Sequence, residues 1–131
     1  LLPTKAVTEV EAEAGAGLVG DRYHRTRHPH VTVQSLDDPR AAAEVLGREV
    51  DPGLTRRNVT LDAGSLPTRP GERLTIGDVE LEVVRIAAPC RLLDDWLGEG
   101  AMAALRSPRG GTVFRLLTSG TIRVGDPATW A

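Results

Sequence analysis

The sequence is poor in aromatic residues. Only four of its 131 residues are aromatic, namely Tyr23, Trp96, Phe114 and Trp130. So few rings argue against a protein that binds single-stranded nucleic acid by stacking its bases. The net charge of −2 and the lack of a basic tail give no electrostatic basis for binding duplex DNA or a membrane surface.

No apolar run reaches the length of a transmembrane helix, and no signal-peptide pattern is present. The chain begins at Leu1 rather than at a methionine. From the lack of a transmembrane run and of a signal-peptide pattern we expect a cytoplasmic protein, and from its composition and charge we expect neither a membrane nor a nucleic acid as a partner.

Cysteine and lysine are almost absent. Cys90 is the only cysteine, so no internal disulfide can form, which suits a reducing compartment. Lys5 is the only lysine among 16 basic residues, so the others are arginines. Arginine recognises phosphate or carboxylate with two hydrogen bonds, although a GC-rich genome produces the same bias. The informative arginines are those grouped in three loops: Arg22 with Arg25 and Arg27, Arg56 with Arg57, and Arg106 with Arg109.

The residues that are present predict a single mostly-β domain over residues 1–131. Apolar residues make up 40% of the chain, which is ordinary for a globular domain long enough to bury its own core. Short alternating segments predict strands at 6–12, 31–34, 58–63, 74–76, 79–84, 113–117 and 121–124. A few short helices are expected at 38–46, after Cys90 and at 101–105. Many short strands and few short helices are typical of a β-barrel.

Turn chemistry predicts two hairpins. Gly77-Asp78 is a two-residue loop between alternating strands, which is a strong hairpin signal. Ser119-Gly120 predicts a second hairpin between strands 113–117 and 121–124. The adjacent Val83 and Val84 shift the alternation of the strand, which predicts a bulge there.

The chain is organised around residues 79–98, where a strand leads through Pro89 and Cys90 into a short helix. The unpaired N–H groups of a helix start, together with Arg91, stabilise a thiolate at this position. Cys90 is therefore a candidate nucleophile or soft-metal ligand. The alternative is that Cys90 is a small buried hydrophobic residue.

The three histidines, His24, His28 and His30, occur in one stretch. Pro29 prevents a continuous helix through that stretch, so a zinc site that combines these histidines with Cys90 is only weakly supported. A thiolate–imidazolium pair between Cys90 and His24 is a further interpretation, because glycines frame His24.

Four stretches, taken in order, give a more specific indication. They are GLVGDRYH at 17–24, TRRNV at 55–59, LTIG at 74–77 and PC at 89–90. Over residues 10–126 the chain resembles the MOSC domain, which occurs at the C-terminus of molybdenum-cofactor sulfurases and as small stand-alone bacterial proteins. The resemblance implies a mostly-β, MOSC-like β-barrel.

The resemblance also implies a site for the molybdenum cofactor (molybdopterin). Cys90 matches the family cysteine that binds sulfur or ligates molybdenum, and a thiolate is a suitable soft ligand for that metal. Arginines suit the phosphate of the pterin. The residues implied to line the pocket around the pterin and its phosphate are Asp21, Arg22, His24, Arg57 and Asn58.

Three functions stay open at this point. The first is a molybdenum-cofactor-dependent oxidoreductase that reduces N-hydroxylated compounds and takes its electrons from another protein, since the chain carries no iron–sulfur or flavin module. The second is a sulfur carrier for metal–sulfur cluster assembly, with a persulfide on Cys90 supplied by a cysteine desulfurase, a setting that implies an association with pyridoxal phosphate. The third is a non-enzymatic module that binds a small ligand and keeps Cys90 inert.

Overall fold

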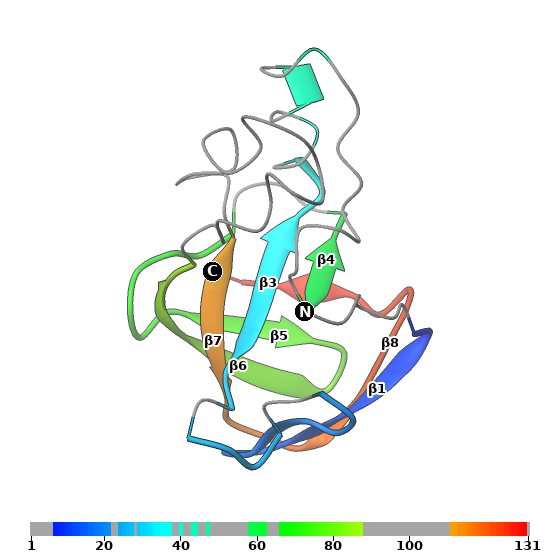
Figure 1. The fold of residues 1–131 in the computed structure, drawn as a ribbon, viewed down its shortest axis with the longest axis vertical. Coiled ribbons are helices and arrows are strands. Elements are labelled where there is room, and N and C mark those ends of the chain that lie inside the picture. Colours follow the sequence, from blue (N-terminus) through cyan, green and yellow to red (C-terminus); the bar gives the residue numbers. More distant parts are fainter. Residues whose placement is uncertain are drawn as a thin grey trace. The chain divides into compact units, whose positions relative to one another are not determined.

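The computed structural model describes residues 7–21, 24–27, 29–37, 40, 43–44, 47, 58–62, 66–87 and 111–130. Strands dominate this part of the chain (Figure 1), which confirms the mostly-β prediction. The strands are β1 (Glu9–Glu13), β2 (Gly17–Leu18), β3 (Val31–Ser35), β4 (Val59–Leu61), β5 (Arg73–Ile76), β6 (Val79–Ile86), β7 (Thr112–Leu116), β8 (Gly120–Arg123) and β9 (Ala128–Thr129).

The chain forms two compact units, and their boundaries cut through three of the strands. Unit 1 comprises residues 1–6, 32–66 and 86–112, and unit 2 comprises residues 7–31, 67–85 and 113–131. Unit 2 therefore holds β1, β2, β5, β8 and β9 with most of β6 and β7. Unit 1 holds β4 with most of β3.

Unit 2 contains a three-stranded antiparallel sheet in the order β2-β1-β8. Ala12 lies opposite Leu18 of β2, and Val10 lies opposite Ile122 of β8. Figure 1 shows β1 and β8 side by side along their length. Because side chains alternate along a strand, Ala12 enters the core while Glu11 stays exposed on the other face.

The hairpin predicted at Gly77-Asp78 is confirmed. It joins β5 to β6 and places Ile76 directly opposite Val79, in a sheet where the unit 2 strands follow the order β7-β6-β5-β9. Val79, Leu81 and Val83 of β6 are buried, whereas Glu80, Glu82 and Val84 between and after them are half-buried. The alternation therefore continues through Val83 and Val84, and the predicted phase shift is not observed.

The second predicted hairpin is wrong, because β8 pairs with β1 rather than with β7. After β7 the chain stays attached to β6: Leu117 N–H donates to the Glu80 carbonyl, and Glu80 N–H donates to Thr118 Oγ1, each at 2.9 Å. The next residue turns toward β1, where Ser119 Oγ accepts a 2.8 Å hydrogen bond from Ala14 N–H. Residues 117–119 therefore lead the chain from one sheet to the other.

Among the described residues of unit 2, the core is aliphatic around one aromatic ring. Phe114 of β7 is completely buried, and the other fully buried large side chains of this unit are Leu74, Ile76, Leu81, Val31, Val79 and Val83. These residues come from β3, β5, β6 and β7, so the sheet is held by side-chain burial as well as by its hydrogen bonds.

Unit 1 is built on a parallel pair of strands. Val33 of β3 lies opposite Val59 of β4, and Ser35 lies opposite Leu61. In the strand order of the sheet, β7 follows β3 on the side away from β4. Thr112 is the residue of β7 that belongs to unit 1. Buried Gln34 is satisfied, because its Nε2 donates to Thr60 Oγ1 at 2.9 Å.

The connection from β3 to β4 includes residues 38–46, where a helix is expected. The described residues of this stretch adopt helical conformation at Asp37, Arg40, Ala43 and Glu44. Arg40 N–H reaches the Leu36 carbonyl at 3.4 Å, four residues back, as in an α-helix. The helices expected after Cys90 and at 101–105 lie outside the described residues.

The two described residues that flank the stretch containing Cys90 are hydrogen-bonded to each other. Ala87 N–H donates a 3.0 Å hydrogen bond to the carbonyl of Gly111, so residues 88–110 begin and end at a hydrogen-bonded pair. Gly111 is buried and has φ +88°, a conformation that favours glycine.

Among the described residues, no helix has the length and apolar character needed to cross a membrane.

Candidate functional site

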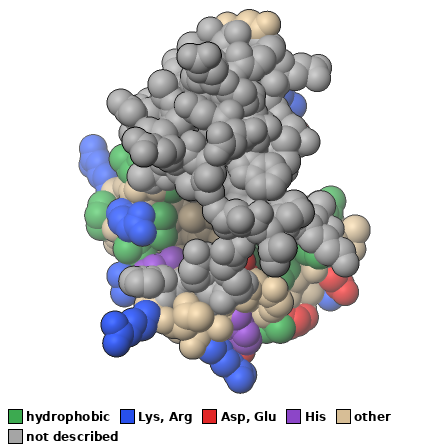
Figure 2. All heavy atoms as spheres, in the orientation of Figure 1, with side chains coloured by type: hydrophobic (Ala, Val, Ile, Leu, Met, Phe, Trp, Pro, Cys, Tyr) green, Lys and Arg blue, Asp and Glu red, His purple; other side chains and the backbone are tan. Residues whose placement is uncertain are grey.

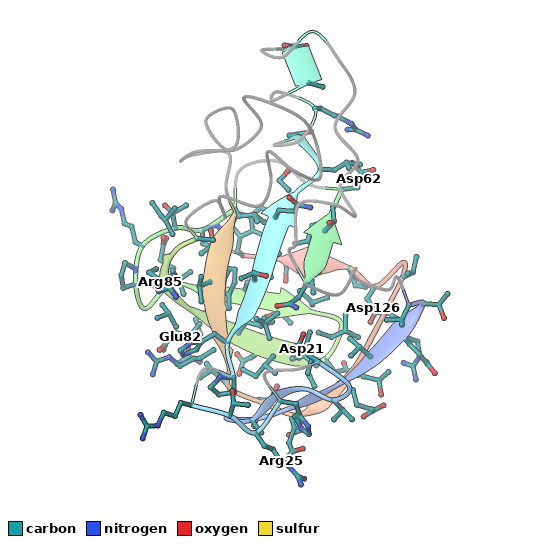
Figure 3. All side chains as sticks on the ribbon, viewed as in Figure 1. Asp21, Arg25, Asp62, Glu82, Arg85 and Asp126 are labelled. Atoms are coloured by element: carbon teal, nitrogen blue, oxygen red, sulfur yellow. The ribbon has the colours of Figure 1, made fainter. Side chains whose placement is uncertain are left out.

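Two of the expected site residues, Asp21 and His24, share one turn between β2 and β3. Asp21 N–H donates to the Leu18 carbonyl at the end of β2, and His24 N–H donates back to the Asp21 carbonyl, both at 3.1 Å. The next residue, Arg25, donates its N–H to the Ala16 carbonyl at 2.7 Å. Figure 3 shows Asp21 and Arg25 on this connection. The turn is thus bonded to β2 and to the turn before it.

Glu13, the last residue of β1, binds the side chains of this turn. Its Oε2 lies 2.9 Å from His24 Nε2, and its two oxygens lie 3.2 and 3.3 Å from Nε and Nη2 of Arg25. The His24 side chain is 18% exposed, whereas that of Arg25 is 70% exposed. Figure 2 shows histidine, acidic and basic side chains reaching the surface close together. We call Glu13, His24 and Arg25 the Glu13 clamp.

The clamp shifts the acid–base behaviour of its carboxylate. The hydrogen bond with His24 lowers the pKa of Glu13 below its ordinary value of 4.5; the hydrogen bond and charge of Arg25 add to this effect, and desolvation opposes it. Glu13 is therefore ionised at neutral pH and can only accept hydrogen bonds. Because a carboxylate cannot donate, the His24 Nε2 that faces it carries the proton.

The base of the same loop depends on Gly17. This residue has φ +99°, and a Cβ built on it comes within 2.8 Å of the Pro29 carbonyl oxygen. The chain entering the loop and the chain leaving it therefore touch at Gly17, where only a hydrogen fits. The glycine at position 17 in the GLVGDRYH stretch thus has a steric role in closing the loop that carries Asp21 and His24.

Asn58 lies in unit 1, immediately before β4, and is bonded to β3. Its Oδ1 accepts from both N–H and Oγ1 of Thr32, at 2.9 and 3.1 Å, and its own N–H donates to Thr32 Oγ1 at 2.9 Å. Since Oδ1 faces a backbone donor, the amide orientation is fixed, and Nδ2 is the end directed away from Thr32. Asn58 thereby joins β3 to β4 and presents a donor group.

The remaining expected residues, Arg22, Arg57 and Cys90, lie outside the described residues. The structure brings Asp21 and His24 together in unit 2 and places Asn58 in unit 1. In the described ranges, His, Cys, Asp and Glu side chains form no group of three or more that could hold a metal ion.

Sequence reasoning did not predict the contact of Glu13 with His24. The alternation of β1 places Glu9, Glu11 and Glu13 on one face. Nothing local distinguishes the third glutamate from the other two. The signal that could have found it is the short β1–β2 connection, which brings the residues after β2 back past the end of β1.

Comparison with known families identifies the class of protein. The model of the MOSC domain matches residues 20–129. The chain therefore belongs to the MOSC domain family, as the four sequence stretches predicted. A comparison with curated proteins gave no match.

Solved structures give the same fold. The YuaD protein from Bacillus subtilis has a TM-score of 0.79 and 13% identity, with 95% of this chain and 85% of that chain covered. YiiM from Geobacillus stearothermophilus has a TM-score of 0.64 and 17% identity, with 95% and 73% covered. YiiM from Escherichia coli has a TM-score of 0.67 and 16% identity, with 94% and 62% covered. This chain thus spans less than two thirds of the Escherichia coli protein. The predicted fold class, a mostly-β MOSC-like barrel, is confirmed.

Proposed function

We propose that this MOSC domain binds the molybdenum cofactor, with Cys90 as the molybdenum ligand, and reduces N-hydroxylated compounds. The MOSC family is associated with this cofactor. The structural observation that carries the proposal is the fixed amide of Asn58. Its oxygen is held by Thr32, so Nδ2 is left as the donor end, next in sequence to Arg57.

The hydrogen-bond donors of Arg57 and Asn58 are suited to a phosphate. Phosphate oxygens accept hydrogen bonds, so an amide N–H group and a guanidinium are complementary to them in hydrogen bonding, and the guanidinium also in charge. Asn58 is exposed at the start of β4 and is anchored through its backbone as well as its oxygen. A donor held in this way binds without losing much further side-chain entropy.

The turn of Asp21 and His24 supports the pterin side of the proposal. The Glu13 clamp directs Nε2 of His24 toward Glu13. Nδ1 is then the ring nitrogen left for a ligand, and in the neutral ring it is an acceptor. A pterin carries N–H groups that such an acceptor recognises. Asp21, in the same turn, adds a carboxylate, which accepts from N–H groups in the same way.

Reduction of an N-hydroxyl group takes two electrons and two protons and releases water. When bound, the cofactor supplies the two-electron chemistry at molybdenum, and the electrons come from a separate donor protein. The residues of this chain bind and orient the cofactor: the Cys90 thiolate holds the metal, Arg57 and Asn58 bind the phosphate, and Asp21 with His24 orients the pterin.

The test is the molybdenum and pterin content of protein made in a host that synthesises the cofactor. We expect near-equal amounts of both in the unchanged protein, and loss of both in Cys90→Ala and Arg57→Ala. The control is Arg115→Ala, which removes an exposed arginine paired with Glu82 at 3.3 Å and should leave the content unchanged. Neither component in the unchanged protein, even after reconstitution with isolated cofactor, would overturn the proposal.

The same samples also test the activity. Loaded protein, supplied with a chemical reductant, should convert a hydroxylamine or amidoxime to the amine or amidine, and Cys90→Ala should not. A reversible sulfur adduct on Cys90 after incubation with a cysteine desulfurase, found together with no molybdenum, would instead support the sulfur-carrier hypothesis.

A further inference from the structure

Hydrogen bonds from three backbone N–H groups anchor the residues that follow β1, close to the turn that carries Asp21 and His24. Ala14 N–H donates to Ser119 Oγ at 2.8 Å, and Gly15 N–H donates to the Leu116 carbonyl at 3.1 Å. Ala16 N–H closes the turn onto the Glu13 carbonyl at 2.9 Å. Glu13 is thus a carboxylate at the end of a strand whose next residues are held by β7 and by the residue that precedes β8, and its side chain bonds to His24 and Arg25 between β2 and β3.

We infer that Glu13 is a positioning residue for the cofactor site: its carboxylate fixes His24 as the Nε2–H tautomer and holds the Asp21–Arg25 turn in place. The consequence for binding rests on the proposed function, because Asp21 and His24 are taken there as cofactor contacts. The effect on the tautomer and on the turn rests only on the contacts described above.

Fixing the tautomer decides what His24 recognises. A neutral imidazole has one donor and one acceptor nitrogen, and the hydrogen bond made by one of them sets the role of the other. With Nε2–H donated to Glu13, Nδ1 accepts from an N–H group of a ligand. Without Glu13 both tautomers become available, and about half of the binding-competent population is lost if their energies are equal.

Arg25 adopts an unfavourable backbone conformation, which the contacts around it must stabilise. Arg25 has φ +60°, which costs a non-glycine residue about 1–2 kcal/mol. Its N–H bond to Ala16 and its two side-chain bonds to Glu13 keep it there. Residues in such conformations persist only where surrounding contacts over-determine them. Glu13 supplies the two side-chain contacts, and the Ala16 carbonyl supplies the backbone contact, one residue after His24.

The other glutamates of β1 do not share this role. Glu9 pairs with Arg123 of β8 at 3.2 Å, and Glu11 accepts from Thr121 of the same strand. Among the described residues, both of these side chains bond to β8. Glu11 is therefore a matched control, since it lies on the same strand and the same face as Glu13 and its side chain bonds to Thr121 instead of to His24 or Arg25.

The first experiment is ring ¹⁵N NMR of His24 at a pH where the ring is neutral. The unchanged protein and Glu11→Gln should show the Nε2–H tautomer. Glu13→Gln should show a mixture, because a glutamine amide can accept from or donate to Nε2, and the amide protons of His24 and Arg25 should exchange faster. Glu13→Gln keeps the size of the side chain, so it removes the charge without removing the packing of the side chain. A mixture in the unchanged protein, or no change in Glu13→Gln, would overturn the inference.

The second experiment measures cofactor retention by the same variants. We expect Glu13→Gln to retain about half as much pterin as Glu11→Gln when both variants are folded, and less than half where the turn is also released. Equal retention would overturn the role of Glu13 in binding. If the unchanged protein retains no pterin, the proposed function fails and the binding consequence fails with it, while the NMR result still decides whether Glu13 positions His24.

Discussion

The carbonyl oxygen of Val33 lies where a side chain at Gly111 would begin, since a Cβ built at Gly111 comes within 2.6 Å of it. This contact joins β3 to the residue that precedes β7. It also explains why the chain uses a buried glycine there with φ +88°.

Gly111→Ala should lower the free energy of unfolding by about 2–5 kcal/mol, because it adds a clash with β3 to the cost of a positive φ. Gly125→Ala is the control: Gly125 has φ +94° but nothing within 4 Å of a built Cβ. It should lose only about 1–2 kcal/mol. Urea denaturation measures both variants. Equal losses would show that the Val33 carbonyl moves aside without cost.

Two substitutions of Asn58 should separate folding from binding. Asn58→Ala removes the acceptor for Thr32 and should cost about 1 kcal/mol of unfolding free energy, since water reaches this exposed site. Asn58→Asp keeps an accepting oxygen and should fall within about 0.5 kcal/mol of the unchanged protein. Both variants lose the Nδ2 donor, so both should lose pterin and molybdenum. Cofactor retained in Asn58→Asp would contradict the role given to Nδ2.

The Glu13 clamp should make stability depend on pH in the acid range. The pKa of Glu13 is lower in the folded protein than its ordinary value of 4.5, so the folded state binds the proton less readily than the unfolded chain. The stabilisation is fully present above that ordinary value and is lost as the pH falls through the folded pKa. The difference in unfolding free energy between the unchanged protein and Glu13→Gln should therefore shrink below pH 4.5. A Glu11→Gln variant with the same profile would show that general charge on the strand is responsible.

Gly17→Ala should open the loop that carries His24. The added Cβ meets the Pro29 carbonyl at 2.8 Å, whereas Gly15, with φ +72°, has nothing within 4 Å of a built Cβ. We expect Gly17→Ala to cost about 2–5 kcal/mol and Gly15→Ala about 1–2 kcal/mol. Hydrogen exchange at His24 and Arg25 should accelerate only in Gly17→Ala. Similar exchange in the two variants would argue that Pro29 does not hold the loop.

The parts of the fold that sequence predicted well are those decided by neighbours in the chain. The β5–β6 hairpin follows from Gly77-Asp78 and the alternation on either side. The turn at Ser119-Gly120 looked equivalent but behaves differently, because Ser119 Oγ binds Ala14 N–H, 105 positions away. No local pattern reports such a partner, so the pairing of β8 with β1 could not be read from the sequence.

In the candidate site, too, contacts between residues close in sequence could be predicted, and contacts between distant residues could not. Asp21 and His24 could be predicted to lie together, because they are three positions apart in a glycine-bearing turn. The partnership of His24 with Glu13 depends on how β1 and β2 fold back on each other, and three glutamates of β1 compete for it on sequence grounds. Asn58 was expected as a ligand residue only, and its second role, tying β3 to β4 through Thr32, depends on the parallel pairing of those strands.

The hydrogen bond between Ala87 and Gly111 has a consequence for how such a domain evolves. The stretch that bears Cys90 is inserted between two residues that are already joined, so its two ends do not have to be brought together by its own sequence. Doubling the length of a closed loop costs only about 0.6 kcal/mol. We therefore expect insertions or deletions between Ala87 and Gly111 to cost little free energy of loop closure. New reactivity can arise there while the sheets that support it keep their sequence.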